Sequence, residues 1–246
     1  MKRSFSFLAI LFATTTAAQA EPLLPTFDPA NFDPAAAIDN PYLSLAPGFS
    51  REVSGQIAED EGDLVTEVSV QTYDGAGPLI AEVQTTLILD RSFIDGMLVE
   101  EAHDFFAQDR AGNVWYLGED VINLTYDDED RVIAVDTHGT WRAGVDGAEA
   151  GFAMPAAPQV GMVYFQEHAP ANEALDVGEI LSLEGQIEGP LSSYDKVLAV
   201  FETSQIEPDL REVKFYAEGV GLVRVWEGID AQKSNPEAVF DLTKRD

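Results

Sequence analysis

The sequence lacks cysteine altogether and is poor in basic residues. Without cysteine there is no disulfide framework and no thiol that could carry a lipid anchor. Only 14 of the 246 residues are Lys or Arg, against 44 Asp and Glu, so the formal net charge is −30. A charge of this sign repels nucleic acid phosphates and anionic membrane surfaces, and we expect neither as a partner. The simplest interpretation is a solvated acidic surface suited to saline surroundings, and a dedicated cation-binding face is the alternative.

Long apolar runs are absent after the first twenty residues. The chain begins with Lys2 and Arg3, an apolar run over residues 5–13 and the triplet Ala18-Gln19-Ala20, which is the pattern of a secretory signal peptide. We therefore expect a signal peptide over residues 1–20 and a periplasmic or secreted product without a membrane span. Cleavage would leave 12 basic and 44 acidic residues, a net charge of −32.

The motifs of several catalytic and cofactor-binding classes are also missing. The sequence has no Gly-x-Ser-x-Gly elbow, no Gly-rich phosphate loop opening a helix and no His-Glu-x-x-His. The three histidines, His103, His138 and His168, are scattered without metal-ligand spacing, so we interpret them as structural or solvent-facing. The sequence therefore predicts no cofactor.

What the sequence does contain is a succession of short runs with alternating apolar residues, separated by turn signals. We expect strands over 49–57, 64–73, 79–89, 121–126, 131–135, 163–168, 175–183, 193–203, 211–217 and 222–227. Turns are expected at 59–63, 74–78 and 95–96. Short polar links between such runs predict antiparallel neighbours. The predicted fold is mainly β, a single antiparallel meander forming a curved sheet or incomplete barrel.

Two segments do not follow this alternation. Residues 21–47 are rich in proline, which predicts an extended arm packed on a single β domain over 48–246. Residues 139–161 are too rich in Gly, Ala and Pro for a regular element and too long for an idle connection. We expect this loop either to fold across the sheet as a lid, held by Trp141, Phe152 and Met154, or to close one end of a barrel.

The stretch 97–119 is the most informative part of the chain. Two strand-like runs flank Asp109-Arg110-Ala111-Gly112-Asn113, in which Gly112 suits the positive φ of a short hairpin loop. Acids alternate with aromatic residues on both faces, which favours a surface that is half sheet and half pocket. The alternative is an edge strand whose charges discourage pairing with other chains.

Three segments resemble a group of uncharacterised secreted bacterial proteins. They are HDFFAQDRAGNVWYLGED (103–120), GTWRAGVDGAEAGFAMPAAPQVG (139–161) and KFYAEGVGLV (214–223), and the entry segment IDNPY (38–42) is similar too. The group usually has Asp-Trp-Tyr-Ala-Gln-Asp where this chain has DFFAQD. The last hairpin, YAEGVGLV, also resembles that of periplasmic half-barrel proteins that shelter apolar ligands, which implies a related fold but assigns no function.

These observations favour a binding or carrier module for a small apolar or amphipathic ligand. The candidate ligand-binding residues are Glu101, Asp104, Phe106, Trp115, Tyr116, Trp141, Phe152 and Tyr164. One alternative is a carboxylate hydrolase of the glycosidase type, in which Asp104 and Glu119 would act as acid and base. Another is a structural or interaction protein of the cell envelope. The sequence does not specify an oligomeric state.

The acidic run 127–130 is the remaining candidate site. Asp127, Asp128 and Asp130 could supply oxygens to calcium, but the run lacks the spaced order of a calcium loop. We favour a solvated hairpin tip.

Overall fold

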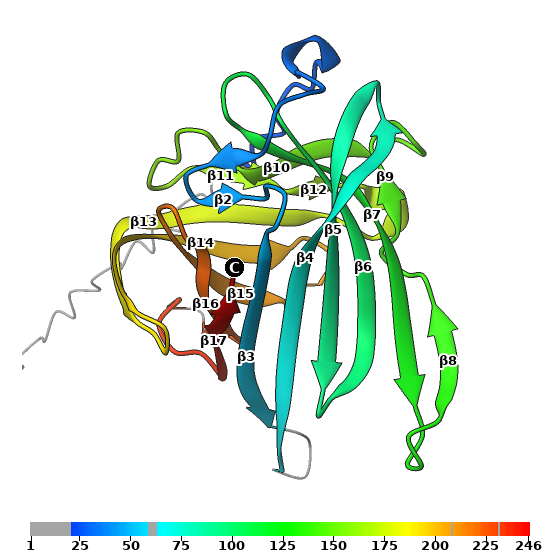
Figure 1. Ribbon diagram of the computed structural model, residues 1–246, viewed down its shortest axis with the longest axis vertical. Helices are drawn as coiled ribbons and strands as arrows, with labels where there is room; N and C mark the ends of the chain where they lie inside the picture. The colour runs from blue at the N-terminus through cyan, green and yellow to red at the C-terminus, as the bar shows by residue number, and fades with distance from the viewer. Residues whose placement is uncertain (1–20, 59–62, 208, 231) are drawn as a thin grey trace, which may run out of the picture.

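The computed structural model describes residues 21–58, 63–207, 209–230 and 232–246 (Figure 1), so the expected signal peptide lies outside the described residues. Apart from two 3-10 turns, η1 (Pro29–Asn31) and η2 (Pro170–Asn172), the regular elements are strands. The first part of the chain forms β1 (Asp39–Asn40), β2 (Leu43–Ser44), β3 (Ser50–Ala58), β4 (Leu64–Ile80), β5 (Val83–Ile94), β6 (Met97–Gln108), β7 (Val114–Tyr126) and β8 (Val132–Asp136). The rest forms β9 (Trp141–Arg142), β10 (Glu149–Met154), β11 (Val163–Phe165), β12 (Glu167–His168), β13 (Asp176–Glu188), β14 (Ser193–Ser204), β15 (Arg211–Ala217), β16 (Gly221–Glu227) and β17 (Ala238–Arg245).

The strands form one large antiparallel sheet, while β1 and β2 pair separately in the arm. The sheet order is β11-β13-β14-β15-β16-β17-β3-β4-β5-β6-β7-β10-β12, so two meanders, β3–β7 and β13–β17, are joined where β17 pairs with β3. Figure 1 shows the two meanders crossing at a steep angle, as the walls of a strongly curved sheet do. The sheet is nearly closed, with one seam, which confirms the predicted mainly β, incomplete-barrel fold.

The seam lies between β11 and β12, which end the sheet yet follow each other in the chain. Gly151 of β10 lies against this connection, since a Cβ there would be 2.3 Å from the Phe165 carbonyl oxygen. The N-terminal arm reaches the same place, because Leu23 pairs with Tyr164. Further along the arm, Phe27 and Phe32 pack on Trp115 with ring centroids 5.4 and 5.9 Å away. The arm therefore covers the seam end of the barrel.

Two local predictions were wrong. The turn expected at 74–78 is part of β4, which runs on to Ile80 with register shifts at Tyr73/Gly75 and Ala76/Leu79. The glycines there accommodate bulges, and the chain reverses instead at Ala81 and Glu82, whose φ values of 45° and 68° suit a tight hairpin turn.

The 139–161 segment is not an irregular loop or a lid. It contains β9 and β10, which both pair with β7. Gly144 and Gly147, with φ near +84° and +83°, form the turn between them. Trp141, Phe152 and Met154 are buried in the core, so the segment is part of the barrel wall.

One strand departs from the compact body. β8 pairs only with β7, and all five of its residues are exposed, including Val132, Ile133 and Val135 (Figure 1). Within the described residues, no helix is long and apolar enough to cross a membrane.

Candidate functional site

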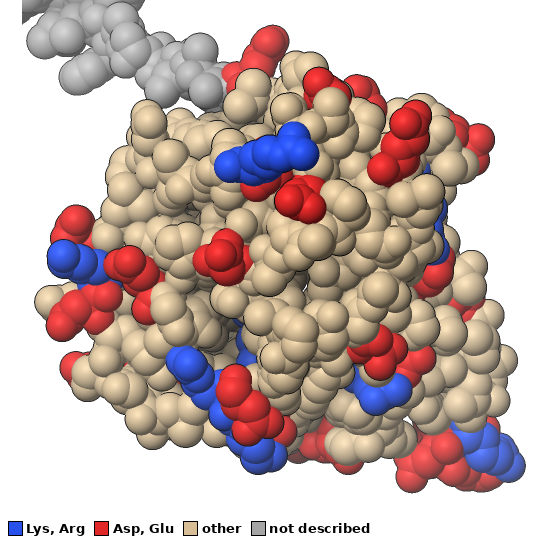
Figure 2. Space-filling model, turned by 45° about the horizontal axis from the view of Figure 1, so that its top comes forward, with Lys and Arg blue, Asp and Glu red and all other residues tan. Residues whose placement is uncertain are grey.

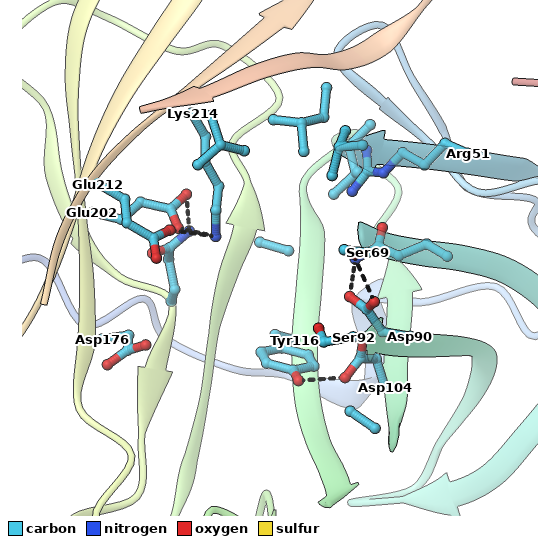
Figure 3. A pocket seen from close by; sticks show the side chains of 18 of the residues that line it. Arg51, Ser69, Asp90, Ser92, Asp104, Tyr116, Asp176, Glu202, Glu212 and Lys214 are labelled. Atoms are coloured by element: carbon cyan, nitrogen blue, oxygen red, sulfur yellow. Dashed lines mark hydrogen bonds and ion pairs between the residues drawn. The ribbon is translucent and has the colours of Figure 1, made fainter. Parts of the chain in front are cut away.

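The curved sheet encloses a cavity of about 420 Å³ with an unusual lining. Figure 3 shows the labelled polar side chains in two groups that face each other across open space. The β4–β7 wall contributes five carboxyl groups, from Glu67, Asp90, Glu100, Asp104 and Glu119. The opposite wall contributes five more, from Glu167, Asp176, Glu202, Glu212 and Glu227. Arg51 and Lys214 are the two basic residues in the lining, so carboxyl groups outnumber cations ten to two.

A β-bulge sets the acidic face of β7. Asp104 of β6 pairs with Glu119, but Phe106 pairs with Tyr116, so β7 has one extra residue between these pairs. The extra residue changes the alternation of faces and lets Tyr116 and Glu119, three positions apart, both line the cavity. Gly118 makes this possible, because its φ of 138° and the Trp141 carbonyl, 2.4 Å from the position of a Cβ, leave no room for a side chain.

Two carboxyl groups of the β4–β7 wall, those of Asp90 and Asp104, are held by hydrogen bonds from neighbouring strands (Figure 3). The Tyr116 hydroxyl donates to Asp104 Oδ1 at 2.8 Å. The Ser69 hydroxyl donates to Asp90 Oδ1 at 3.0 Å, and the Gln71 side-chain amide donates to Asp90 Oδ2. These contacts fix the side chains of Asp90 and Asp104, so this part of the wall is preorganised.

On the opposite wall a single lysine balances two acids. Lys214 Nζ lies 2.6 Å from Glu202 Oε2 and 3.4 Å from Glu212 Oε2, and Gln166 Nε2 donates to Glu202 Oε1 at 3.0 Å. Burial opposes the charged form of the lysine, but the fields of Glu202 and Glu212 outweigh it and raise the pKa of Lys214 well above its usual value. This cluster is therefore locally compensated.

Most of the remaining acids resist ionisation. Burial raises the pKa of Glu119 to about 7, and the charges of Glu100 and Asp176 add to the shift. Burial likewise raises the pKa of Asp176 to about 6 and that of Glu227 to about 7. For Asp104 burial and the charge of Asp90, and for Glu167 burial and the charge of Glu119, raise the pKa well above the usual value. The cavity therefore holds protons that fully solvated carboxyl groups would release.

These shifts predict that stability falls as pH rises from 5 to 8. A carboxyl group whose pKa is raised in the folded protein binds more protons there than in the unfolded chain at any pH between the two pKa values. The free energy of unfolding therefore falls as pH rises from the unfolded pKa to the folded pKa. For Glu119, a pKa of about 7 against an ordinary 4.5 corresponds to a loss on the order of 3 kcal/mol. Urea unfolding at constant ionic strength and several pH values measures this slope.

The Glu119→Gln variant is the matched comparison for that experiment. It removes the titrating group, so its unfolding free energy should vary less between pH 5 and 8, and it should exceed that of the wild type at pH 8. Carboxyl groups with lowered pKa, such as Glu52, titrate below this window and do not obscure it. A wild-type stability that rises from pH 5 to 8 would contradict the expectation.

Four of the residues singled out from the sequence line the cavity: Asp104, Phe106, Tyr116 and Glu119. The other lining acids were not identified, although β4 carries a readable signal in the alternating polar residues Glu67, Ser69 and Gln71. The sequence contained the same signal in Glu212 and Lys214 of β15. Polar residues at every second position of a strand mark a face that turns to water, but they do not distinguish an inner cavity from an outer surface.

The other candidates for ligand contact lie elsewhere. Trp115, Trp141, Phe152 and Tyr164 are buried in the core and do not line the cavity. The Trp115 indole packs on Phe152 at 4.6 Å between centroids, and its Nε1 donates to Asp109. Glu101 belongs to the other face of β6, where it pairs with Arg91 at 2.7 Å. These four aromatic residues therefore fill the interior, and Phe106 and Tyr116 are the aromatic residues predicted from the sequence that line the cavity.

The acidic run 127–130 forms the tip of the β7–β8 hairpin. Arg131 contacts Asp127 at 2.7 Å and Glu129 at 2.6 Å, so a nearby cation already balances part of its charge. Within the described part of the chain, no three His, Cys, Asp or Glu side chains are grouped so that they could hold a metal ion. On the outer surface, the face in Figure 2 carries acids singly or in small groups.

Comparisons with known proteins do not place the chain in a family. No model of a known protein family matches the chain, and no curated protein matches it. A solved structure, that of a "putative lipoprotein" from Parabacteroides distasonis ATCC 8503, is similar over 83% of this chain and 98% of its own. Its sequence identity is 13% and its TM-score 0.37, so it contributes no argument about function.

Proposed function

We propose that the protein is an exported binding module that takes up a small, positively charged ligand in the acidic cavity of its incomplete barrel. The observation that carries this proposal is the ten-to-two excess of carboxyl groups over basic side chains around a preorganised hollow of about 420 Å³. The signal-peptide pattern and the resemblance to secreted bacterial proteins support export.

The lining argues for a cation in place of the apolar ligand expected from the sequence. Ligand pockets for apolar molecules are lined mainly by hydrophobic side chains, with few polar groups. Here an apolar ligand would have to displace water from a lining with ten carboxyl groups, several of which have no protein partner, and that is costly. A cation instead relieves their mutual repulsion, so charge complementarity favours it.

Cation binding is expected to release protons. A positive charge beside Glu119 or Asp176, whose pKa values are about 7 and 6, favours their ionised forms. Isothermal titration calorimetry with cadaverine and spermidine should give tighter binding at pH 8 than at pH 5, by about tenfold or more. At pH 6.5 the measured enthalpy should depend on the ionisation enthalpy of the buffer.

Two double variants, each of which removes two negative charges, distinguish binding in the cavity from a general attraction of cations by the acidic protein. Glu119→Gln with Glu167→Gln removes two lining carboxyl groups and should weaken binding. Asp128→Asn with Asp130→Asn makes the same net change at the exposed hairpin tip and should leave binding unaltered at 0.15 M salt. Equal effects of both pairs, or binding of lauric acid but of neither amine, would contradict the proposal.

The hydrolase alternative receives less support from the same groups. Acid and base roles need two carboxyl groups whose pKa values are pushed apart. Asp104 and Glu119 are paired across β6 and β7, yet burial raises the pKa of both. No adjacent tryptophan lines the cavity to stack against a sugar. A broad glycoside and ester panel remains the direct assay for this alternative.

A further inference from the structure

Arg51 is the exception among the charged groups of the cavity. It lies on β3, lines the cavity and is only 9% exposed. Figure 3 shows its side chain extending from β3 toward the open space above Ser69 and Asp90. Its Nη1 atom is buried and has no hydrogen-bond partner among the described residues, and none of the ion pairs found there includes it.

The Arg51 guanidinium lies 5.6 Å from the centre of the Phe49 ring but has no hydrogen-bond acceptor among the described residues, in contrast to Lys214, the other basic residue of the lining. Lys214 contacts Glu202 and Glu212 directly, whereas no carboxylate of the described residues lies within ion-pairing distance of Arg51. A buried donor without an acceptor is destabilising, and more so when the group is charged. The planar guanidinium matches a carboxylate, to which it can donate two parallel hydrogen bonds.

We infer that Arg51 receives the carboxylate of the ligand, and that the ligand is a basic amino acid or a similar zwitterion with excess positive charge. This inference rests on the proposed function, since the cationic part of the ligand would face the acids. The alternative of a simple anion does not fit at pH 8, because the carboxyl groups around the same hollow that are ionised there, including Glu119, Asp176 and Glu227, would repel it. A ligand with both charges satisfies the acids and Arg51 together.

Decarboxylated amines distinguish this inference from a general attraction of cations by the acids, because the two explanations predict opposite orders of affinity. Agmatine is arginine without its carboxylate, and cadaverine is lysine without its carboxylate. General attraction by the acids favours the two amines, which carry the larger net positive charge. A carboxylate bound by Arg51 favours the two amino acids instead, since an amine leaves the guanidinium unpartnered.

The experiment measures the affinity of all four compounds by calorimetry at pH 8. In the wild type, arginine should bind at least about tenfold tighter than agmatine, or lysine at least about tenfold tighter than cadaverine. In Arg51→Met that preference should disappear or reverse, because affinity for the amino acid falls while affinity for the amine is kept or rises. Arg51→Lys keeps the charge but loses the two-pronged geometry, so it should recover only part of the preference.

Arg91→Met is the matched control, since Arg91 pairs with Glu101 on the outer face of β5 and should leave all four affinities unchanged. Circular dichroism and thermal melting establish that each variant is folded. If Arg51→Met does not fold, the affinity of the wild type for the amino acids relative to the amines, and its change in Arg51→Lys, still test the inference. Amines that bind as tightly as the amino acids in the wild type overturn this inference but keep the proposed function. Binding of none of the four overturns both.

Discussion

Replacing Lys214 by methionine is expected to lower the free energy of unfolding by about 2 kcal/mol at pH 7.5, between the values for an exposed and a buried ion pair, because the Lys214 side chain is half-buried. The substitution leaves Glu202 and Glu212 facing each other without the ammonium group that lies 2.6 and 3.4 Å from them. The loss should shrink at pH 5, because unpaired carboxyl groups can then take up protons. Urea unfolding at both pH values measures the difference.

Lys244→Met is the control for this prediction. Lys244 contacts Glu52 at 2.7 Å, as close as the main contact of Lys214, but its side chain is 75% exposed. Solvent-exposed pairs contribute roughly 0–1 kcal/mol, so this variant should be nearly neutral. Adding Glu202→Gln to Lys214→Met should recover part of the lost stability. A Lys214→Met protein as stable as the wild type at pH 7.5 would show that the cluster is solvated and not dependent on the lysine.

Replacing Asp109 by alanine should cost more, about 4 kcal/mol, because one buried carboxylate organises the whole β6–β7 turn. It accepts hydrogen bonds from the backbone amides of Ala111 and Asn113, from the Asn113 side chain and from Trp115 Nε1. Without it, the indole N–H of Trp115 becomes a buried donor lacking an acceptor. Denaturant unfolding followed by tryptophan fluorescence measures the loss.

Asp127→Ala tests whether the burial of Asp109 is the reason for the large loss of stability expected in Asp109→Ala. Asp127 makes the same local pattern, accepting from the backbone amides two and four residues later, Glu129 and Arg131, but at an exposed hairpin tip. Water can replace these bonds, so we expect a much smaller loss than that of Asp109→Ala. Similar losses in the two variants would mean that the hydrogen-bond pattern, and not its burial beside Trp115, sets the stability of the turn.

The overall architecture could be predicted from the sequence because strand alternation and turn signals are local properties. The antiparallel meander follows from short links between such runs. The prediction failed where glycines lie inside a strand. Gly75 and Gly77 indicated a turn, but they lie within β4, and the chain reverses at Ala81 and Glu82. The pairing of β17 with β3, which brings distant parts of the chain together, has no local signal at all.

The site was only partly predictable for a similar reason. Asp104 and Glu119 stood out because they lie near aromatic residues, yet Trp115 and Trp141 belong to the core and only Phe106 and Tyr116 line the cavity. The bulge at Gly118 decides that Tyr116 and Glu119 share a face, and a regular alternation cannot foresee it. The joining of acids from both meanders around one hollow depends on sheet curvature, which composition does not encode.

The β7–β8 hairpin has a consequence for how copies of the protein behave toward one another in concentrated solution. β8 offers a free strand edge with exposed Val132, Ile133 and Val135, which is the kind of template along which molecules aggregate. The acids at its tip, including Asp128 and Asp130, place like charges where a second copy would dock. We interpret this acidic tip as a gatekeeper that keeps the protein dispersed, a protection that weakens in strong salt because mobile ions screen it.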